Sequence, residues 1–177
     1  MKKTLMILGL IAIIGLMAEW NIGIEAAPAT GPRVGNLAPN FTLSDLNGRR
    51  VTLNDVIRNN RATVVNFWAT WCPPCRAEIP ELISFYRRYS GQRVALLAVN
   101  LQESPGDVRR FARQQGMNFP VLTDTGGTVG NLYQVYALPT TFIIDQRGRI
   151  RSKIEGGTTL ANLENQIRPL LRNASGR

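Results

Sequence analysis

The stretch Trp71-Cys72-Pro73-Pro74-Cys75 contains both cysteines of this 177-residue chain, which has no histidine. One residue, Thr70, separates it from the apolar run Thr63–Ala69. Two cysteines separated by two residues close a small disulfide ring when the first one opens a helix, and Pro73 suits a first helical turn because its missing N–H would be unpaired there. The N-terminus of such a helix lowers the pKa of Cys72, and a thiolate is the attacking species in disulfide exchange. The motif therefore predicts dithiol redox chemistry.

Two other interpretations of the cysteine pair are weaker. A structural zinc site needs about four ligands, and the chain offers neither histidine nor a second cysteine pair. A purely structural disulfide across so short a loop constrains the unfolded chain little, and the flanking Trp71 and the two internal prolines suit an exposed helix start better. We therefore expect no metal ion and no organic cofactor, only a redox-active disulfide between Cys72 and Cys75.

The N-terminus has the pattern of an export signal. Two lysines precede an apolar stretch from Leu5 to Ala18, and Glu19 and Glu25 follow it. Positive charge before the apolar stretch and negative charge after it place the N-terminus inside and the rest of the chain outside the cytoplasm. The remaining length and the 44% hydrophobic content fit one compact domain, since common domains have roughly 100 to 150 residues.

Cleavage of this segment stays open at this point. The apolar core is short for a membrane span, yet it reaches about 20 residues when extended to Ile24. Ala27-Pro28-Ala29 has the spacing of a cleavage site, but its proline disfavours cleavage. We favour an uncleaved anchor that holds the domain on the outer face of the cytoplasmic membrane; a cleaved signal would make it periplasmic or secreted. The expected organisation is a signal peptide or membrane anchor (1–27), a linker (28–35), the folded domain (36–172) and a tail (173–177).

The chain is basic, with a formal charge of +9, and 18 of its 21 basic residues are arginine. These arginines are scattered along the sequence and are not interleaved with aromatic residues, so we expect no nucleic-acid partner. A solvated basic surface, or attraction to anionic lipid headgroups, is the better interpretation.

Strands and helices alternate along the domain. Asn47-Gly48, between Phe41–Ser44 and Val51–Leu53, is a strong hairpin signal. The hydrophobic patterns predict strands at 63–69, 94–100 and 121–122, helices at 73–89, 105–115, 129–136 and 158–171, and a second hairpin formed by 141–145 and 150–155. This order predicts an α/β layer structure that ends in an antiparallel hairpin.

The run Phe67–Cys75, followed far downstream by Leu138-Pro139-Thr140-Thr141-Phe142, resembles the thioredoxin superfamily. Within that superfamily the chain is similar to exported TlpA/ResA-type thiol-disulfide oxidoreductases over about residues 33–172. Further segments occur in the order of that group: Pro39–Asp45, Ala98–Asn100, Asn118–Val121 and Asp124. The resemblance implies a thioredoxin fold, with a central mixed sheet flanked by helices and an added N-terminal β-hairpin.

The resemblance also implies that Pro139 is a cis proline facing the two cysteines; the alternative is a trans turn proline before a strand. A cis X-Pro bond bends the chain and removes an N–H, which leaves the backbone of Leu138 free to pair with an extended substrate segment. Together with Trp71, Pro73 and Pro74, these two residues form the expected substrate-binding surface.

Glu78 is the third expected catalytic residue, after Cys72 and Cys75. It lies one helical turn after Cys75 and matches an acidic residue that the ResA-like group places near its cysteines, while Asn66 stands where cytoplasmic thioredoxins carry a buried aspartate. We expect Glu78 to handle the proton of Cys75 or to tune the thiol pKa values, because a carboxylate held near a thiol couples their titrations. The alternative is a solvated helix residue paired with an arginine.

The expected reaction starts with attack by Cys72 on a disulfide of a client protein and ends when Cys75 resolves the mixed disulfide. The resemblance implies a reductase that receives electrons from a membrane thiol carrier and serves clients such as apocytochrome c during cytochrome c maturation; we expect it to act as a monomer. One alternative is a general disulfide oxidant or isomerase of exported proteins. Another is a thiol peroxidase, although the Pro-xxx-Thr-xx-Cys signature of peroxiredoxins would require proline at Val65 and threonine at Ala69.

Overall fold

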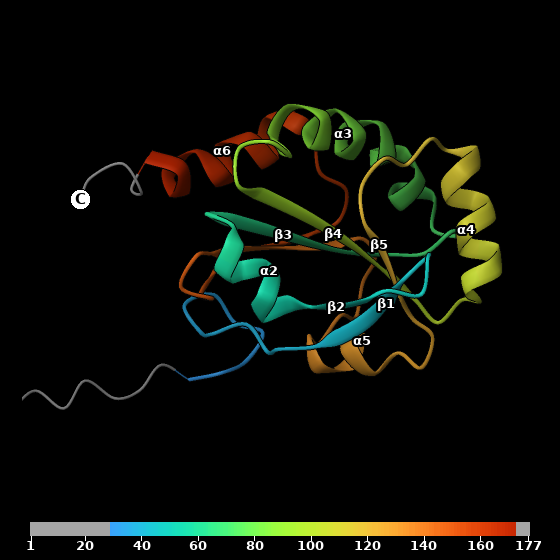
Figure 1. The fold of residues 1–177 in the computed structure, drawn as a ribbon, viewed down its shortest axis with the longest axis horizontal. Coiled ribbons are helices and arrows are strands. Elements are labelled where there is room, and N and C mark those ends of the chain that lie inside the picture. The colour runs from blue at the N-terminus through green and yellow to red at the C-terminus, as the bar shows by residue number, and fades with distance from the viewer. Residues whose placement is uncertain (1–28, 173–177) are drawn as a thin grey trace, which may run out of the picture.

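The computed structural model describes residues 29–172, which form a seven-stranded sheet and five helices (Figure 1). The strands are β1 (Thr42–Asp45), β2 (Arg50–Thr52), β3 (Ala62–Trp68), β4 (Val94–Leu101), β5 (Val121–Asp124), β6 (Thr140–Asp145) and β7 (Ile150–Glu155). The helices are α2 (Leu53–Asn59), α3 (Pro73–Tyr89), α4 (Pro105–Gln114), α5 (Thr128–Leu132) and α6 (Leu160–Arg172). The predicted signal or anchor and the predicted tail lie outside the described residues. Within residues 29–172, no helix is long and apolar enough to cross a membrane.

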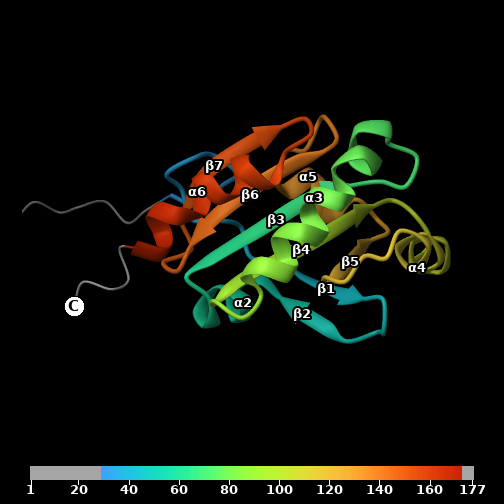
Figure 2. The same cartoon turned by 90° about the horizontal axis from the view of Figure 1, so that it is seen from above.

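The sheet is mixed, with the strand order β2-β1-β5-β4-β3-β6-β7. Strands β3, β4 and β5 run parallel, and the other neighbouring pairs are antiparallel. Viewed from above the sheet, β2 and β7 lie at opposite edges (Figure 2). This arrangement confirms the predicted central mixed sheet, the N-terminal hairpin and the C-terminal hairpin.

Strand β3 is buried along its whole length and supplies side chains to both cores. Val64 and Trp68 belong to the core under α3 and α6, whereas Val65 and Phe67 belong to the core on the opposite face with α2 and α5. Successive side chains of a strand point to opposite faces, so a nearly continuous apolar run is what a central strand needs. In Figure 1, α3 and α6 lie above the sheet, and α5 lies below it.

Helix α3 covers residues 73–89, as predicted. Cys72 is its N-cap and two prolines occupy the first turn, where their missing N–H groups cost nothing. The apolar spacing read from the sequence corresponds to the face that packs on the sheet, where Ile79, Leu82 and Phe85 are each at most 2% exposed. The start of this helix therefore fixes both cysteines against the end of β3.

Two short helices differ from the prediction. The helix predicted over 129–136 ends at Leu132, because Gln134 adopts a left-handed backbone with φ of 49°. Tyr133 anchors the turn: its ring is buried and its hydroxyl donates to the carbonyl of Pro39 at 2.7 Å. As a result Tyr136 is not helical and is 89% exposed. The other short helix, α2, was not predicted at all.

Residues 29–35, within the predicted linker, contact the folded domain. Gly31 N donates to Leu37 O at 2.9 Å, and Gly35 N donates to Ile150 O at 2.8 Å. These bonds hold the described beginning of the chain beside β7 and the turn that precedes it. The predicted boundaries between linker, domain and tail stay predictions.

Candidate active site

The two cysteines form a disulfide directly after β3, at the N-terminus of α3. The Cys72 and Cys75 sulfur atoms are 2.08 Å apart, and the Cys72 sulfur accepts a hydrogen bond from the Cys75 backbone N–H at 3.3 Å. In the reduced state a thiolate on Cys72 would occupy this N-cap position, where the helix N–H groups and dipole favour negative charge. Both residues are nearly covered, with exposed fractions of 2% and 1%.

A groove of about 410 Å³ lies beside the disulfide, and no charged side chain lines it. Its lining residues are Trp71, Cys72, Pro73, Pro74, Leu101, Gln102, Val135, Tyr136 and Leu138. Cys72 belongs to this lining and Cys75 does not. The groove therefore adjoins the first cysteine and not the second.

Two exposed aromatic residues line this groove. Trp71 is 68% exposed and Tyr136 is 89% exposed, and both appear in a short group of exposed large hydrophobic residues in the described part of the chain. Exposed aromatic rings next to a reactive group offer a partner apolar contact area. The prediction named Trp71; it missed Tyr136, because nothing in the sequence marks where α5 ends.

The Leu138–Pro139 peptide bond is cis, as the family resemblance implied, and not trans; that Pro139 faces the two cysteines stays a prediction. The carbonyl of Pro139 accepts from Gly156 N at 2.8 Å. Within residues 29–172, the backbone N–H and C=O of Leu138 have no hydrogen-bond partner. Leu138 also lines the groove, so an extended segment lying there would meet free backbone groups.

Glu78 is buried, with an exposed fraction of 3%. Its two carboxylate oxygens accept hydrogen bonds, one from Asn66 Nδ2 at 2.8 Å and the other from the Thr158 backbone N–H at 2.8 Å. Burial raises the pKa of Glu78 to about 7, although the bonds from Thr158 and Asn66 act in the opposite direction. The alternative of a solvated residue paired with an arginine is therefore wrong. Near neutral pH this carboxyl group is able both to accept and to release a proton.

A second carboxylate, that of Glu103, holds the loop in front of the cysteines. It accepts from the backbone N–H of Thr70 at 2.7 Å and from the hydroxyl of the same residue, and Asn100 Nδ2 donates to it at 2.6 Å. These bonds tie the segment before Trp71 to the end of β4. Glu103 is not among the predicted site residues, since its bond to Thr70 joins positions 33 residues apart.

A model of the AhpC/TSA family matches residues 34–153. The chain belongs to the AhpC/TSA family. Among curated members, the thiol-disulfide oxidoreductase ResA of Geobacillus thermodenitrificans is 38% identical over 165 residues, which are 93% of this chain and 92% of the relative. ResA of Bacillus subtilis is 41% identical over 125 residues, or 71% and 69% of the two chains.

Two solved structures share the fold of this chain. A protein described as the thiol:disulfide interchange protein DsbE of Chlorobium tepidum superimposes with a TM-score of 0.71 at 33% identity, covering 78% of this chain and 98% of that one. StoA of Bacillus subtilis gives 0.64 at 28% identity, with coverages of 73% and 97%. The predicted membership of the thioredoxin superfamily and the predicted thiol-disulfide oxidoreductase activity are confirmed.

In this AhpC/TSA-family chain the predicted substrate-binding residues and Glu78 lie in the groove lining, beside it in sequence, or behind the cysteines. Four of the five predicted substrate-binding residues line the groove: Trp71, Pro73, Pro74 and Leu138. Pro139 lies next to the groove in sequence but is not part of its lining. Glu78 is one helical turn behind Cys75, bonded to β3 and to the segment before α6. The roles of all these residues stay predictions.

Proposed function

We propose that this protein reduces disulfide bonds of exported proteins through its Cys72/Cys75 pair. The observation that carries the proposal is the different position of the two cysteines: Cys72 lines the groove and Cys75 does not, although both are nearly covered. A dithiol with one sulfur at a groove and the other outside its lining suits attack by the first and resolution by the second.

The reaction moves two electrons and two protons from the enzyme dithiol to the client. The Cys72 thiolate attacks one sulfur of the client disulfide; a mixed disulfide forms, and the other client sulfur leaves as a thiolate that takes up a proton. Cys75, after losing its proton, attacks the Cys72 sulfur. The enzyme disulfide closes, and the second client sulfur is released as a thiolate that takes up the second proton. The redox-active disulfide is the only electron carrier in this scheme, so no organic cofactor takes part.

Glu78 serves the second half of this reaction in our proposal. Its carboxyl group has a pKa raised to about 7 by burial, and it lies one helical turn after Cys75. A group that titrates near the working pH is suited to accept the proton of Cys75 as the resolving thiolate forms. The covered position of Cys75 keeps bulk water from doing the same task efficiently.

The client binds along the groove in an extended conformation. The free N–H and C=O groups of Leu138 pair with its backbone, while Trp71 and Tyr136 contact the apolar side chains beside the client cysteine. An uncharged groove favours clients whose cysteines are flanked by apolar residues. Apocytochrome c is our candidate client, on the basis of the ResA-type resemblance.

The same proposal places the enzyme outside the cytoplasm. The predicted export signal supports this location, and the favoured uncleaved anchor would hold the domain at the outer face of the cytoplasmic membrane. Disulfides persist in that compartment, so a reductase there needs a supply of electrons across the membrane. A membrane thiol carrier fills that role, and the enzyme acts as a monomer.

The first experiment is a measurement of the reduction potential of the cysteine pair in glutathione or dithiothreitol buffers. Tryptophan fluorescence provides the signal, since Trp68 is buried at the end of β3 and Trp71 adjoins Cys72. A reduction potential of about −250 mV or lower supports electron delivery to a client. A potential of about −120 mV marks an oxidant that makes disulfides. The second result would overturn the proposed direction and leave the thiol-disulfide chemistry intact.

A trapping experiment tests the assignment of the two cysteines. The Cys75→Ser variant should accumulate a mixed disulfide with a client peptide, because the resolving sulfur is missing. The Cys72→Ser variant is the matched control and should trap much less, since its remaining thiol lies outside the groove lining. Equal trapping by both variants would show that the assignment is wrong.

A further inference from the structure

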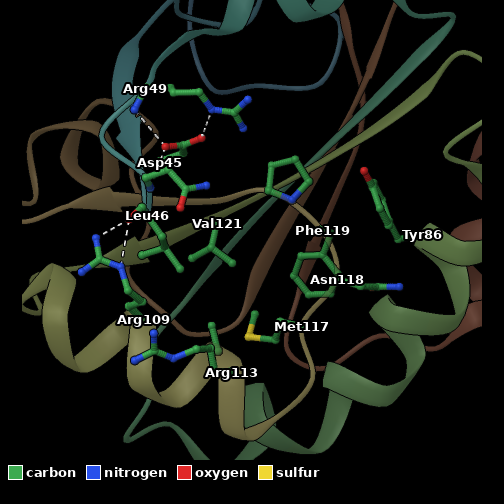
Figure 3. Close-up of a pocket in the computed structure, with 13 residues that line it drawn as sticks. Asp45, Leu46, Arg49, Tyr86, Arg109, Arg113, Met117, Asn118, Phe119 and Val121 are labelled. Carbon is green, nitrogen blue, oxygen red and sulfur yellow. Dashed lines mark hydrogen bonds and ion pairs between the residues drawn. The ribbon is translucent and has the colours of Figure 1, made fainter.

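A second cavity, of about 430 Å³, lies between the β1–β2 turn, α4 and the loop that leads into β5 (Figure 3). Its lining shares no residue with the groove beside the disulfide. The volume falls within the range of about 300–1,000 Å³ that small-molecule sites occupy. A molecule bound here would leave the disulfide accessible.

One part of this cavity is apolar. Leu46, Met117, Phe119 and Val121 line it, and the last two are only 6% and 4% exposed. The ring of Phe119 is supported from behind, because it packs edge-to-face against Tyr86 with the ring centroids 6.2 Å apart. Phe119 and Val121 therefore belong to the packed core, and Leu46 and Met117 are partly buried against it.

The other part of the cavity is cationic: Arg49 from the β1–β2 turn lines it together with Arg109 and Arg113 from α4. Arg109 and Arg113 are four residues apart on α4 and so lie on one face of that helix. The Arg109 guanidinium donates two hydrogen bonds to the carbonyl of Leu46, through Nε at 3.0 Å and through Nη2. These bonds use two of its five N–H donors and fix its plane beside the cavity.

The charge of this lining is not balanced. It includes three arginines and one carboxylate, that of Asp45, which is already paired with Arg49 at 2.8 Å and bonded to two backbone N–H groups. Within residues 29–172, neither Arg109 nor Arg113 forms an ion pair. Two guanidinium groups without an ion pair, in a lining that also includes apolar side chains, are complementary to an anion that carries an apolar body.

We propose that this cavity binds a small carboxylic acid whose carboxylate meets Arg109 and Arg113 and whose apolar body lies against Met117, Phe119 and Val121. Arginine presents paired N–H donors that match the two oxygens of a carboxylate. A bare inorganic anion would leave the apolar wall unused, and a neutral apolar molecule would leave the two cations unpaired.

Calorimetric titration of the full chain with two matched probes tests this site. The probes are 4-phenylbutyrate and 4-phenylbutanol, which share the phenyl body and differ in the anionic group. The carboxylate is expected to bind with one site per chain and at least about tenfold more tightly than the alcohol, since hydrogen bonds to charged groups are the strong ones. Equal affinity for the two probes, or no saturable binding of the carboxylate, would overturn the proposal.

Arginine variants locate the binding on this face of α4. Arg113→Gln should weaken 4-phenylbutyrate binding by about fivefold or more, because a charge-assisted hydrogen bond is lost. The side chain of Arg113 is exposed and its loss removes no hydrogen bond of the described fold, so the variant is expected to fold.

Arg110→Gln is the matched control. Arg110 lies on the same helix, is paired with Asp107 at 2.9 Å and is absent from the cavity lining, so its removal changes the net charge equally but should leave the affinity unchanged.

Asn118→Trp fills the cavity from an exposed position and should abolish binding while disulfide exchange continues at the wild-type rate. An equal loss in Arg110→Gln and Arg113→Gln, or full binding by Asn118→Trp, would show that the site is wrongly placed.

Discussion

Burial of the Glu78 carboxyl group changes its pKa and therefore the proton chemistry that it is able to perform. A buried carboxylate is costly unless it is hydrogen-bonded, and here each oxygen has a single donor. The two donors do not offset the lost solvation, so the pKa is raised to about 7. This cost to the fold has a chemical use if the group exchanges a proton with Cys75 during each catalytic cycle.

A raised carboxyl pKa predicts a specific dependence of stability on pH. The proton on Glu78 is bound more tightly in the folded state, where the pKa is about 7, than in the unfolded state, where it is 4.5. The protonated Glu78 carboxyl group therefore contributes to the free energy of unfolding in full below about pH 4.5, and this contribution is lost as the pH rises through about 7. The total loss is about 3 kcal/mol. We expect Glu78→Gln to remove this fall, as measured by urea unfolding of the oxidised protein from pH 4.5 to 8. Parallel profiles for the two proteins would contradict the assignment.

The same substitution should slow the resolving step. Without the carboxyl group, Glu78→Gln is expected to release the client from the mixed disulfide at least about tenfold more slowly near pH 7, and the dependence of this step on a group titrating near 7 should disappear. Stopped-flow fluorescence of a preformed mixed disulfide measures the step. Glu81→Gln, one turn further along α3 and bonded to Leu160 N, is the control and should keep the wild-type profile. A slowed step with an unchanged pH profile would indicate only a structural role for Glu78.

Tyr136 should contribute to client binding without affecting the redox chemistry. We expect Tyr136→Ala to lower kcat/KM for a disulfide-bearing client protein by about three- to tenfold, the scale of one aromatic contact. The reduction potential should stay at the wild-type value. Val34→Ala, which removes another exposed apolar side chain outside the groove, is the control for general surface effects. An unchanged kcat/KM would remove Tyr136 from the client-binding surface.

The residues that the sequence identified and those that it missed differ in a physical way. Short sequence motifs identify Cys72, Cys75 and Pro139, so the positions of these residues in the fold follow from their neighbours in the chain. Glu103 and Tyr136 act through distant partners or through the end of a short helix. No local pattern reports a bond between residues 33 positions apart.

At the scale of secondary-structure elements, α4 shows how a capped helix supports the active-site region. The hydroxyl of Ser104 accepts from the Asp107 backbone N–H at 3.2 Å, and Pro105 begins the helix. The centroid of the Phe111 ring, on this helix, lies 5.7 Å from that of the Trp68 ring. The guanidinium carbon of Arg76 lies over the Phe111 ring, 5.8 Å from its centroid. The cap thus stabilises a helix that packs beside the end of β3.

Loss of this cap should destabilise the protein modestly. We expect Ser104→Ala to lower the free energy of unfolding by about 1 kcal/mol, because an N-terminal N–H loses its side-chain acceptor. Urea unfolding monitored by circular dichroism measures the change. Ser90→Ala is the control: Ser90 is the C-cap residue of α3, where its backbone N–H rather than its side chain makes the capping bond, so little change is expected. Equal losses in both variants would argue against a specific cap.

The elements that were predicted well have strong local signals. The start of α3 follows from a cap, two prolines and a long apolar face, and both hairpins follow from turn glycines with positive φ, Gly48 and Gly148. Helices α2 and α5 have seven and five residues, too few for a clear helical period. Tertiary contacts fix their ends, such as the bond from the Tyr133 hydroxyl to Pro39, and such contacts are invisible to local patterns.

At the scale of the whole molecule, the redox direction and the stability of the fold are linked by a thermodynamic cycle. The difference in unfolding free energy between the oxidised and reduced protein equals nF times the difference between the unfolded-state and folded-state potentials of the cysteine pair. A fold that lowers the potential below that of the unfolded chain is therefore more stable when oxidised. A fold that stabilises the reduced form makes an oxidant instead.

The proposed reductase should accordingly unfold at a higher urea concentration when oxidised than when reduced. Each 30 mV by which the fold lowers the potential should add about 1.4 kcal/mol to the stability of the oxidised form. Paired urea titrations with and without dithiothreitol measure this difference, with the potential of the unfolded chain determined in concentrated urea. The Cys72→Ser/Cys75→Ser variant should unfold identically in both conditions, which controls for the reductant itself. A reduced form that is the more stable of the two would reverse the direction of electron flow that we propose, because a fold cannot favour the dithiol and at the same time make it a strong donor.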